Sequence, residues 1–178
     1  DIIGSYSTTP GKIVLNSDDT NSDVKRKIFS FYTFYSRFIN VSLIVDKYPE
    51  LIFRTNFVDA LGHRKKYIFL FRNGIDIVKS ISHWSERKGV VDNNNNADWW
   101  GLNDQKWYIL CDEVVKYDVD LAHHYELIRT YSDHSYRAAV EWIVTMKKGL
   151  EVSSNYDKHT FISIKYEDYV NKKSVRDN

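Results

Sequence analysis

The clearest pattern in the chain is a run of apolar and aromatic residues over 66–71 that passes directly into an amphipathic helical pattern. An apolar run of this length, bounded by turn residues, predicts a strand buried on both faces. Gly74 suits a tight turn from strand to helix, and the carboxylate of Asp76 favours the first turn of a helix. The pattern therefore predicts a strand over 66–71 followed by a helix over 75–88.

The preceding residues alternate in the same way between helical and extended patterns. They predict an irregular segment over 1–21, a helix from Ser22 or Asp23 to about Ile39, a strand over 41–45 and a helix over 50–61. The apolar stripe of the first helix consists of Val24, Ile28, Phe31, Tyr35 and Phe38. Pro49 stops the strand and opens the second helix, which closes at Gly62.

The second half of the chain is mostly helical in pattern. A stretch over 89–98 contains four consecutive Asn residues and predicts a loop. Further elements are predicted as helices over 107–115, 119–131 and 135–148 and a strand over 160–165. The last helix should turn Tyr136, Val140, Ile143 and Val144 inward. Alternating strands and helices imply a single α/β domain over 1–178, with a parallel sheet and helices on both faces.

Composition narrows the function classes. The 178 residues suffice for one domain with a real core, and 43% hydrophobic residues indicate a packed globular protein. A formal net charge of +1 gives no global attraction to nucleic acid or an acidic membrane, so an anion site must be local. The single Cys111 excludes an internal disulfide. Without a membrane-span pattern or signal pattern, a cytoplasmic location is favoured, and a start at Asp1 suggests a trimmed piece.

Arg72 is the first candidate for binding, because it lies at the carboxyl edge of the predicted sheet. Ligands bind at this edge in open α/β sheets, and helix N-termini there attract phosphates. Ser80 follows eight residues later, just over two helical turns on, so it stays on roughly the same helix face. A guanidinium and a hydroxyl are good donors to one phosphate. The simpler alternative is an ordinary strand–turn–helix with a surface Arg.

The segment 71–80 also resembles the element of sulfotransferases that holds the 3′-phosphate of 3′-phosphoadenosine 5′-phosphosulfate (PAPS). In that family an Arg at a strand end and a Ser eight residues later bind the phosphate, with Asp between them, as Arg72, Asp76 and Ser80 stand here. Three more segments resemble parts of the family's sequence and occur in the same order. The first is 45–49 with Phe53, Arg54 and Phe57. The second is Trp99, Trp100 and Gly101 with Trp107, and the third is 164–170. Together the matches span roughly 41–172.

The resemblance implies a P-loop-like sulfotransferase fold and transfer of a sulfuryl group from PAPS to a hydroxyl, with adenosine 3′,5′-bisphosphate as product. It places Asp46 where many glycan-acting members carry a carboxylate base, and Lys47 where a cation meets the transferring group. A carboxylate can accept the acceptor's proton, and an ammonium can neutralise charge on the bridging oxygen. A surface ion pair is the alternative for these two residues. The acceptor can be a glycan, a protein or a small molecule.

Two departures from the family pattern lie at the ends of the chain. Gly4 to Thr9 offers hydroxyls for a 5′-phosphosulfate loop but lacks its basic residue, and Pro10 interrupts the helix that should follow. After 164–170, the basic residues are Lys172, Lys173 and Arg176. These departures suggest a truncated or divergent member. They favour a second interpretation, a non-catalytic nucleotide-binding module that kept the fold.

Other chemistries have less support. A nucleotide kinase requires a Gly-x-x-x-x-Gly-Lys-Ser/Thr loop, which the sequence lacks. Adjacent His123 and His124 point to different sides of a helix, so no metal site is predicted. Cys111 lies in a helical pattern and is expected to be an inert thiol. The Trp residues of 99–107 are expected in the core, with an acceptor cleft as the alternative. A structural domain that binds a partner through its aromatic face is a further interpretation.

Overall fold

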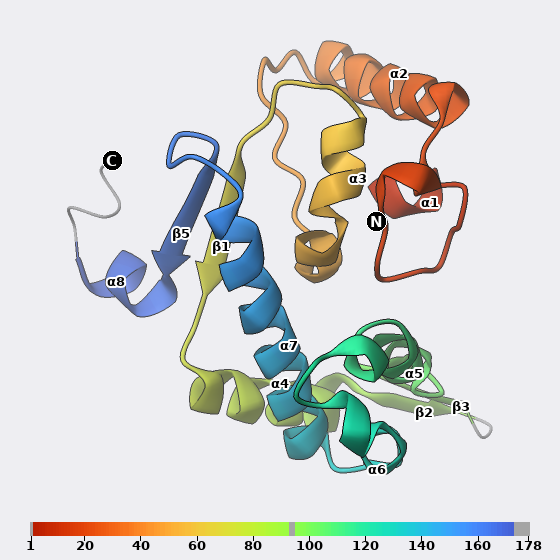
Figure 1. The fold of residues 1–178 in the computed structure, drawn as a ribbon, viewed down its shortest axis with the longest axis vertical. Helices are drawn as coiled ribbons and strands as arrows, with labels where there is room; N and C mark the ends of the chain where they lie inside the picture. Colours follow the sequence, from red (N-terminus) through yellow and green to blue (C-terminus); the bar gives the residue numbers. More distant parts are fainter. Residues whose placement is uncertain (1, 93–94, 173–178) are drawn as a thin grey trace. The chain divides into compact units, whose positions relative to one another are not determined.

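The structure is a computed structural model that describes residues 2–92 and 95–172. The chain forms two compact units, with the division between Arg64 and Lys65 (Figure 1). Together they make an α/β protein with mostly helices and one parallel sheet of two strands. None of the helices in the described ranges combines the length and apolarity that a membrane crossing requires.

The first unit consists of helices and 3₁₀ turns around a small apolar core. Its elements are α1 (Ile2–Ser5), η1 (Ser17–Asp19), α2 (Ser22–Phe38), η2 (Pro49–Arg54) and α3 (Thr55–Ala60). The core contains Leu15, Val24, Ile28, Phe57 and Leu61. Pro49 opens η2 as predicted, and Gly62 ends this helical region at a φ of 80°, which favours glycine. The predicted helix over 50–61 is thus confirmed as a 3₁₀ turn followed by α3.

Helix α2 confirms the predicted helix but only half of its predicted stripe. Its cap is Asn21, whose side-chain oxygen accepts a hydrogen bond from the Val24 amide at 2.9 Å. The buried row passes from Val24 through Ile28 to Tyr32, since the core reaches only the first half of the helix. The predicted inward position of Phe38 was wrong, because 77% of that residue is exposed.

The predicted strand over 41–45 was also wrong. All five residues are described, and they form an irregular segment in which Leu43 and Val45 are 77% and 80% exposed. An alternating apolar pattern becomes a strand only when a neighbouring strand completes its hydrogen bonds. The segment 41–45 makes no such pairing within the described residues.

The second unit alternates strands and helices. Its elements are β1 (Tyr67–Phe71), α4 (Gly74–Lys88), β2 (Val90–Asp92), β3 (Asn95–Asp98), β4 (Gly101–Leu102), α5 (Gln105–Glu113), η3 (Val115–Tyr117), η4 (Ala122–His124), α6 (Tyr125–Arg129), α7 (His134–Ser154), β5 (Phe161–Lys165) and α8 (Tyr166–Asn171). The predicted strands over 66–71 and 160–165 and the helix over 75–88 are confirmed.

Other predictions for this unit need correction. The loop expected over 89–98 is an antiparallel pairing of β2 with β3, in which Val90 lies opposite Ala97, while Asn93 and Asn94 fall outside the described residues. The pattern missed this hairpin because its strands are short and rich in polar residues. The helix over 119–131 is broken into η4 and α6.

Strand β1 pairs in parallel with β5, so that Phe69 lies opposite Ser163 and Phe71 opposite Lys165. Figure 1 shows the two arrows side by side and pointing the same way. Exposure alternates along β1, where Ile68 and Leu70 are 67% and 54% exposed. The prediction of a strand buried on both faces was therefore wrong, because a parallel sheet of two strands leaves the side chains of one face accessible.

Helix α7 contacts both α4 and β5. Val140 and Val144 are buried in it as predicted, whereas the predicted inward position of Tyr136 was wrong, because this residue in the first turn is 63% exposed. Ile143 is 38% exposed and is likewise not part of the core. Gly149 contributes to this packing, since the ring of Phe69 occupies the space where a Cβ would stand.

Two of the Trp residues expected in the core lie there, those at positions 100 and 107, whereas Trp99 is only half-buried. Trp100 and Trp107 are fully buried and meet edge to face, with their ring centroids 5.5 Å apart. Arg137 lies against both rings and forms two bonds with Asp104, at 2.6 and 2.9 Å. Cys111 is also fully buried, and burial raises the pKa of its thiol to about 12, in agreement with the expected inert thiol.

Gly149→Ala should destabilise the second unit. Its methyl group would overlap the Phe69 ring, and overpacking of this kind costs roughly 1–3 kcal/mol. Thermal or urea unfolding measures this loss. Leu150→Ala, at a neighbouring position that is 66% exposed, is the matched control and should change stability little. Adding Phe69→Leu to Gly149→Ala should restore part of the lost stability. An unchanged unfolding midpoint for Gly149→Ala would contradict this packing.

Candidate functional site

The turn between β1 and α4 is where sequence and structure both place a candidate site. β1 ends at Phe71, α4 begins at Gly74, and the side-chain oxygen of Asn73 caps α4 by accepting from the Ile75 amide at 2.9 Å. The backbone N–H of Asn73 donates to Glu167 Oε1 at 2.9 Å. Because β5 is parallel to β1 and ends beside it, the start of α8 meets this turn.

Arg72 stands at the centre of this turn. Its guanidinium carbon lies 5.0 Å from the centre of the Tyr166 ring, and one of its terminal nitrogens is 3.9 Å from Asp76 Oδ2. Its Nε is buried and has no hydrogen-bond partner among the described residues. The side chain as a whole is 38% exposed, so a molecule in solution can reach its other donors.

Ser80 is exposed on α4, one turn beyond Asp76. Four helical residues advance about 6 Å along the axis and return to nearly the same face. The structure therefore places Arg72, Asp76 and Ser80 in sequence along one side of the helix start. The helix and strand end that the sequence predicts for Arg72 and Ser80 are confirmed, while their binding of a phosphate stays a prediction.

Trp142 is a member of this site that the sequence analysis missed. It lies on α7, and its indole Nε1 donates to the backbone oxygen of Arg72 at 3.0 Å. Its ring also presses on the first residue of α4, since a Cβ at Gly74 would stand 3.0 Å from two ring atoms. Gly74 is therefore required for this close approach rather than for an unusual backbone angle.

Glu167 brings a carboxylate to the same turn. Hydrogen bonding from the Asn73 amide is the main influence that holds the pKa of Glu167 below its ordinary value, and the nearby charges of Lys165 and Arg72 add to it. Its second oxygen, Oε2, is buried without a hydrogen-bond partner among the described residues. The carboxylate thus stays charged beside Arg72.

Asp46 and Lys47 lie in the first unit, in the irregular stretch before Pro49. Asp46 Oδ2 accepts a hydrogen bond from the Tyr32 hydroxyl at 2.7 Å, and burial together with this bond raises the pKa of Tyr32. Lys47 is exposed. Both can reach solvent from this stretch. No strand ends at these two residues, because 41–45 is irregular, and their roles as base and cation stay a prediction.

The two segments in which the chain departs from the sulfotransferase pattern, near its two ends, make local contacts in the structure. In the segment Gly4 to Thr9, Ser7 donates to the Gly4 oxygen at 2.8 Å and Thr9 to Asp19 Oδ1 at 2.6 Å. At the other end Lys172 pairs with Asp168 at 2.9 Å. Lys173 and Arg176 lie outside the described residues.

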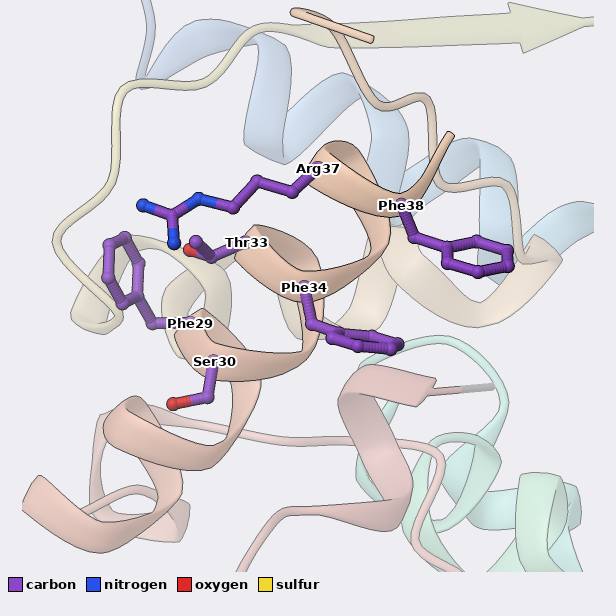
Figure 2. A pocket seen from close by; sticks show the side chains of 6 residues that line it. All are labelled: Phe29, Ser30, Thr33, Phe34, Arg37 and Phe38. Atoms are coloured by element: carbon purple, nitrogen blue, oxygen red, sulfur yellow. The ribbon is translucent and has the colours of Figure 1, made fainter. Parts of the chain in front are cut away.

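A hollow on the first unit is a second place where a ligand could rest. Figure 2 shows the side chains that line it, which all come from α2: Phe29, Ser30, Thr33, Phe34, Arg37 and Phe38. Side chains from a single helix cannot enclose a ligand, whereas a typical binding pocket buries most of the ligand's surface. This hollow therefore lacks the enclosure that is typical of a binding pocket.

The histidines do not form a second site in the part of the chain that is described. There, no three His, Cys, Asp or Glu side chains gather as metal ligands would. His134 has a structural partner instead, because its Nδ1 accepts from the indole of Trp100 at 2.9 Å.

The lowered pKa of Glu167 can be measured directly. A carboxylate whose pKa is lowered by folding stabilises the fold at pH values above its ordinary pKa, and this contribution is lost as the pH falls through the folded value. NMR titration of the Glu167 side chain should give a midpoint below about 4.3, the ordinary value for Glu. Glu167→Gln assigns the signal. A midpoint at or above the ordinary value would contradict the bond to Asn73.

Comparison of the chain with family models, curated proteins and solved structures found no match in any of the three.

Proposed function

We propose that the turn at Arg72 binds the 3′-phosphate of PAPS and that the protein transfers the sulfuryl group to a hydroxyl of its acceptor. The observation that supports this most is the position of Arg72. It follows a parallel strand directly, precedes the start of a 15-residue helix, and has a buried Nε without a hydrogen-bond partner among the described residues. The sulfotransferase resemblance of 71–80 points to the same residue.

The local chemistry fits a phosphate ester. The guanidinium offers paired donors, the N-terminus of α4 carries partial positive charge, and the Ser80 hydroxyl adds a donor along the same helix side. Asp76 competes weakly for Arg72, since their charged atoms are 3.9 Å apart and both side chains are well exposed. Exposed pairs of this kind contribute about 0–1 kcal/mol, so little is lost when Arg72 turns to a phosphate.

The proposed reaction assigns chemistry to Asp46 and Lys47. An acceptor oxygen forms a bond to sulfur, the bond from sulfur to the 5′-phosphate oxygen breaks, and adenosine 3′,5′-bisphosphate leaves with that electron pair. Asp46 takes the proton of the acceptor hydroxyl, and Lys47 neutralises charge on the leaving oxygen. As in phosphoryl transfer, positioning and charge stabilisation supply most of the catalysis.

A second candidate is a nucleotide-binding module without turnover. One observation favours it: the hydroxyls of Ser7 and Thr9, the nearest counterparts of a 5′-phosphosulfate loop, are engaged by Gly4 and Asp19 within the first unit. A module of this kind would bind adenosine 3′,5′-bisphosphate and PAPS but release no sulfate ester.

Arg72→Ala should weaken binding of adenosine 3′,5′-bisphosphate by about tenfold or more, because a hydrogen bond to a charged group contributes roughly 1.5–3 kcal/mol. Isothermal calorimetry at fixed ionic strength measures the change. Arg87→Ala is the matched control, since Arg87 lies on the same helix and its Nε donates to the backbone oxygen of His83 at 3.1 Å. Equal affinities for wild type and Arg72→Ala would reject the site.

Asp46→Asn should keep nucleotide affinity and slow sulfuryl transfer by about 100-fold or more, the usual size of a lost general base. The amide oxygen can still accept from Tyr32, so the local structure is preserved. Transfer of labelled sulfate from PAPS to a panel of glycan, tyrosine-peptide and small-alcohol acceptors provides the assay. Full activity of the variant would show that Asp46 is not the base, and wild type that binds without transfer would support the module.

A further inference from the structure

We infer that Trp142 and Glu167 are positioning residues that lock the peptide group between Arg72 and Asn73, and that this lock sets the affinity for the 3′-phosphate. The inference rests on the proposed function of the turn. Trp142 bonds to the backbone oxygen of Arg72, and Glu167 bonds to the backbone N–H of Asn73. These two backbone atoms belong to one peptide group, so its plane is held at both ends.

Holding this plane matters because it connects strand to helix. Its orientation fixes ψ of Arg72 and φ of Asn73, which set how the Arg72 side chain and the start of α4 are oriented relative to each other. A turn without such bonds can rotate the peptide group between alternative conformations. Arg72 would then populate several positions, and the fraction competent to bind would limit the apparent affinity.

Trp142 holds the oxygen end from α7. Its bond to the Arg72 oxygen is 3.0 Å long, and its ring lies so close to Gly74 that a Cβ would stand 3.0 Å from ring carbons. The contact therefore fixes both sides of the turn, the strand end and the first helical residue. Phenylalanine at this position would keep much of the packing and lose the donor.

Glu167 holds the N–H end from α8, where a carboxylate is unexpected beside an anion site. Its charge opposes a phosphate near Arg72, so its benefit must come from the acceptor bond, 2.9 Å long, that it makes to the Asn73 amide. Glu167 therefore has two separable effects, the acceptor bond to Asn73 and the negative charge. Glutamine retains an oxygen acceptor without the charge, whereas alanine removes both.

The experiment compares two nucleotides that differ only in the 3′-phosphate. Affinities for adenosine 3′,5′-bisphosphate and adenosine 5′-phosphate are measured by calorimetry for the full chain and for Trp142→Phe, Glu167→Ala and Glu167→Gln. Loss of one positioning bond should weaken bisphosphate binding by about 3- to 10-fold in Trp142→Phe relative to wild type, and in Glu167→Ala relative to Glu167→Gln, because both Glu167 variants lack the charge. Binding of adenosine 5′-phosphate should change by less than about twofold, and Glu167→Gln should bind the bisphosphate at least as well as wild type.

Controls separate this inference from the proposed function. Trp84→Phe, at an indole that is 40% exposed and stacked edge to face on Trp99, should leave both affinities unchanged. If Arg72→Ala loses bisphosphate binding while Trp142→Phe binds like wild type and Glu167→Ala binds like Glu167→Gln, the positioning role is overturned and the proposed site is retained. If Arg72→Ala binds adenosine 3′,5′-bisphosphate as tightly as wild type does, the proposed site is wrong.

Amide hydrogen exchange and a variant at Gly74 test the same lock independently. Amide hydrogen exchange without nucleotide should be faster at Asn73 in Glu167→Ala than in Glu167→Gln, and equal rates would overturn the lock. Should Trp142→Phe fail to fold, Gly74→Ala displaces the ring from the other side and should produce the same selective loss. A parallel loss for both nucleotides would show a general structural defect and overturn the inference.

Discussion

The parallel pairing of β1 with β5 is the contact on which the second unit and its candidate site depend. Because paired parallel strands end at the same edge, the register that places Phe71 opposite Lys165 also brings the turn after β1 to the start of α8. Helix α7 then contacts β5, with Gly149 leaving room for the ring of Phe69. Arg72, Trp142 and Glu167 are neighbours only as a result of this arrangement.

The charges at this turn decide what kind of anion site it can be. One guanidinium faces two carboxylates, which would disfavour an anion if all three charges acted equally. Solvent screens the charge of exposed Asp76, which lies 3.9 Å from Arg72, whereas Glu167 stays charged and opposes an anion. The anion site proposed for this turn therefore needs a ligand with its own strong charge and good geometry for Arg72, and a phosphate monoester meets both conditions better than a carboxylate does.

Local patterns predicted much of this unit and little of what brings its parts together. The strand end at Arg72, the helix that carries Ser80 and the core position of Trp107 follow from apolar periodicity and turn chemistry, which a short window of sequence contains. The failure of the strand over 41–45 and the exposure of Ile68 depend on which segments pair, and no short window contains that information. Trp142 was missed for the same reason, because its partner Arg72 is 70 positions away.

The division of the chain bears on the choice between enzyme and binding module. The residues proposed to hold the 3′-phosphate belong to the second unit, whose core includes Trp100, Trp107 and the Arg137–Asp104 pair. The residues proposed for proton transfer and charge neutralisation belong to the first unit. Under the proposed mechanism, changes in the first unit would abolish transfer and leave the turn at Arg72 intact. Binding of adenosine 3′,5′-bisphosphate therefore tests only the turn in the second unit, whereas turnover tests the proposed roles of the first-unit residues.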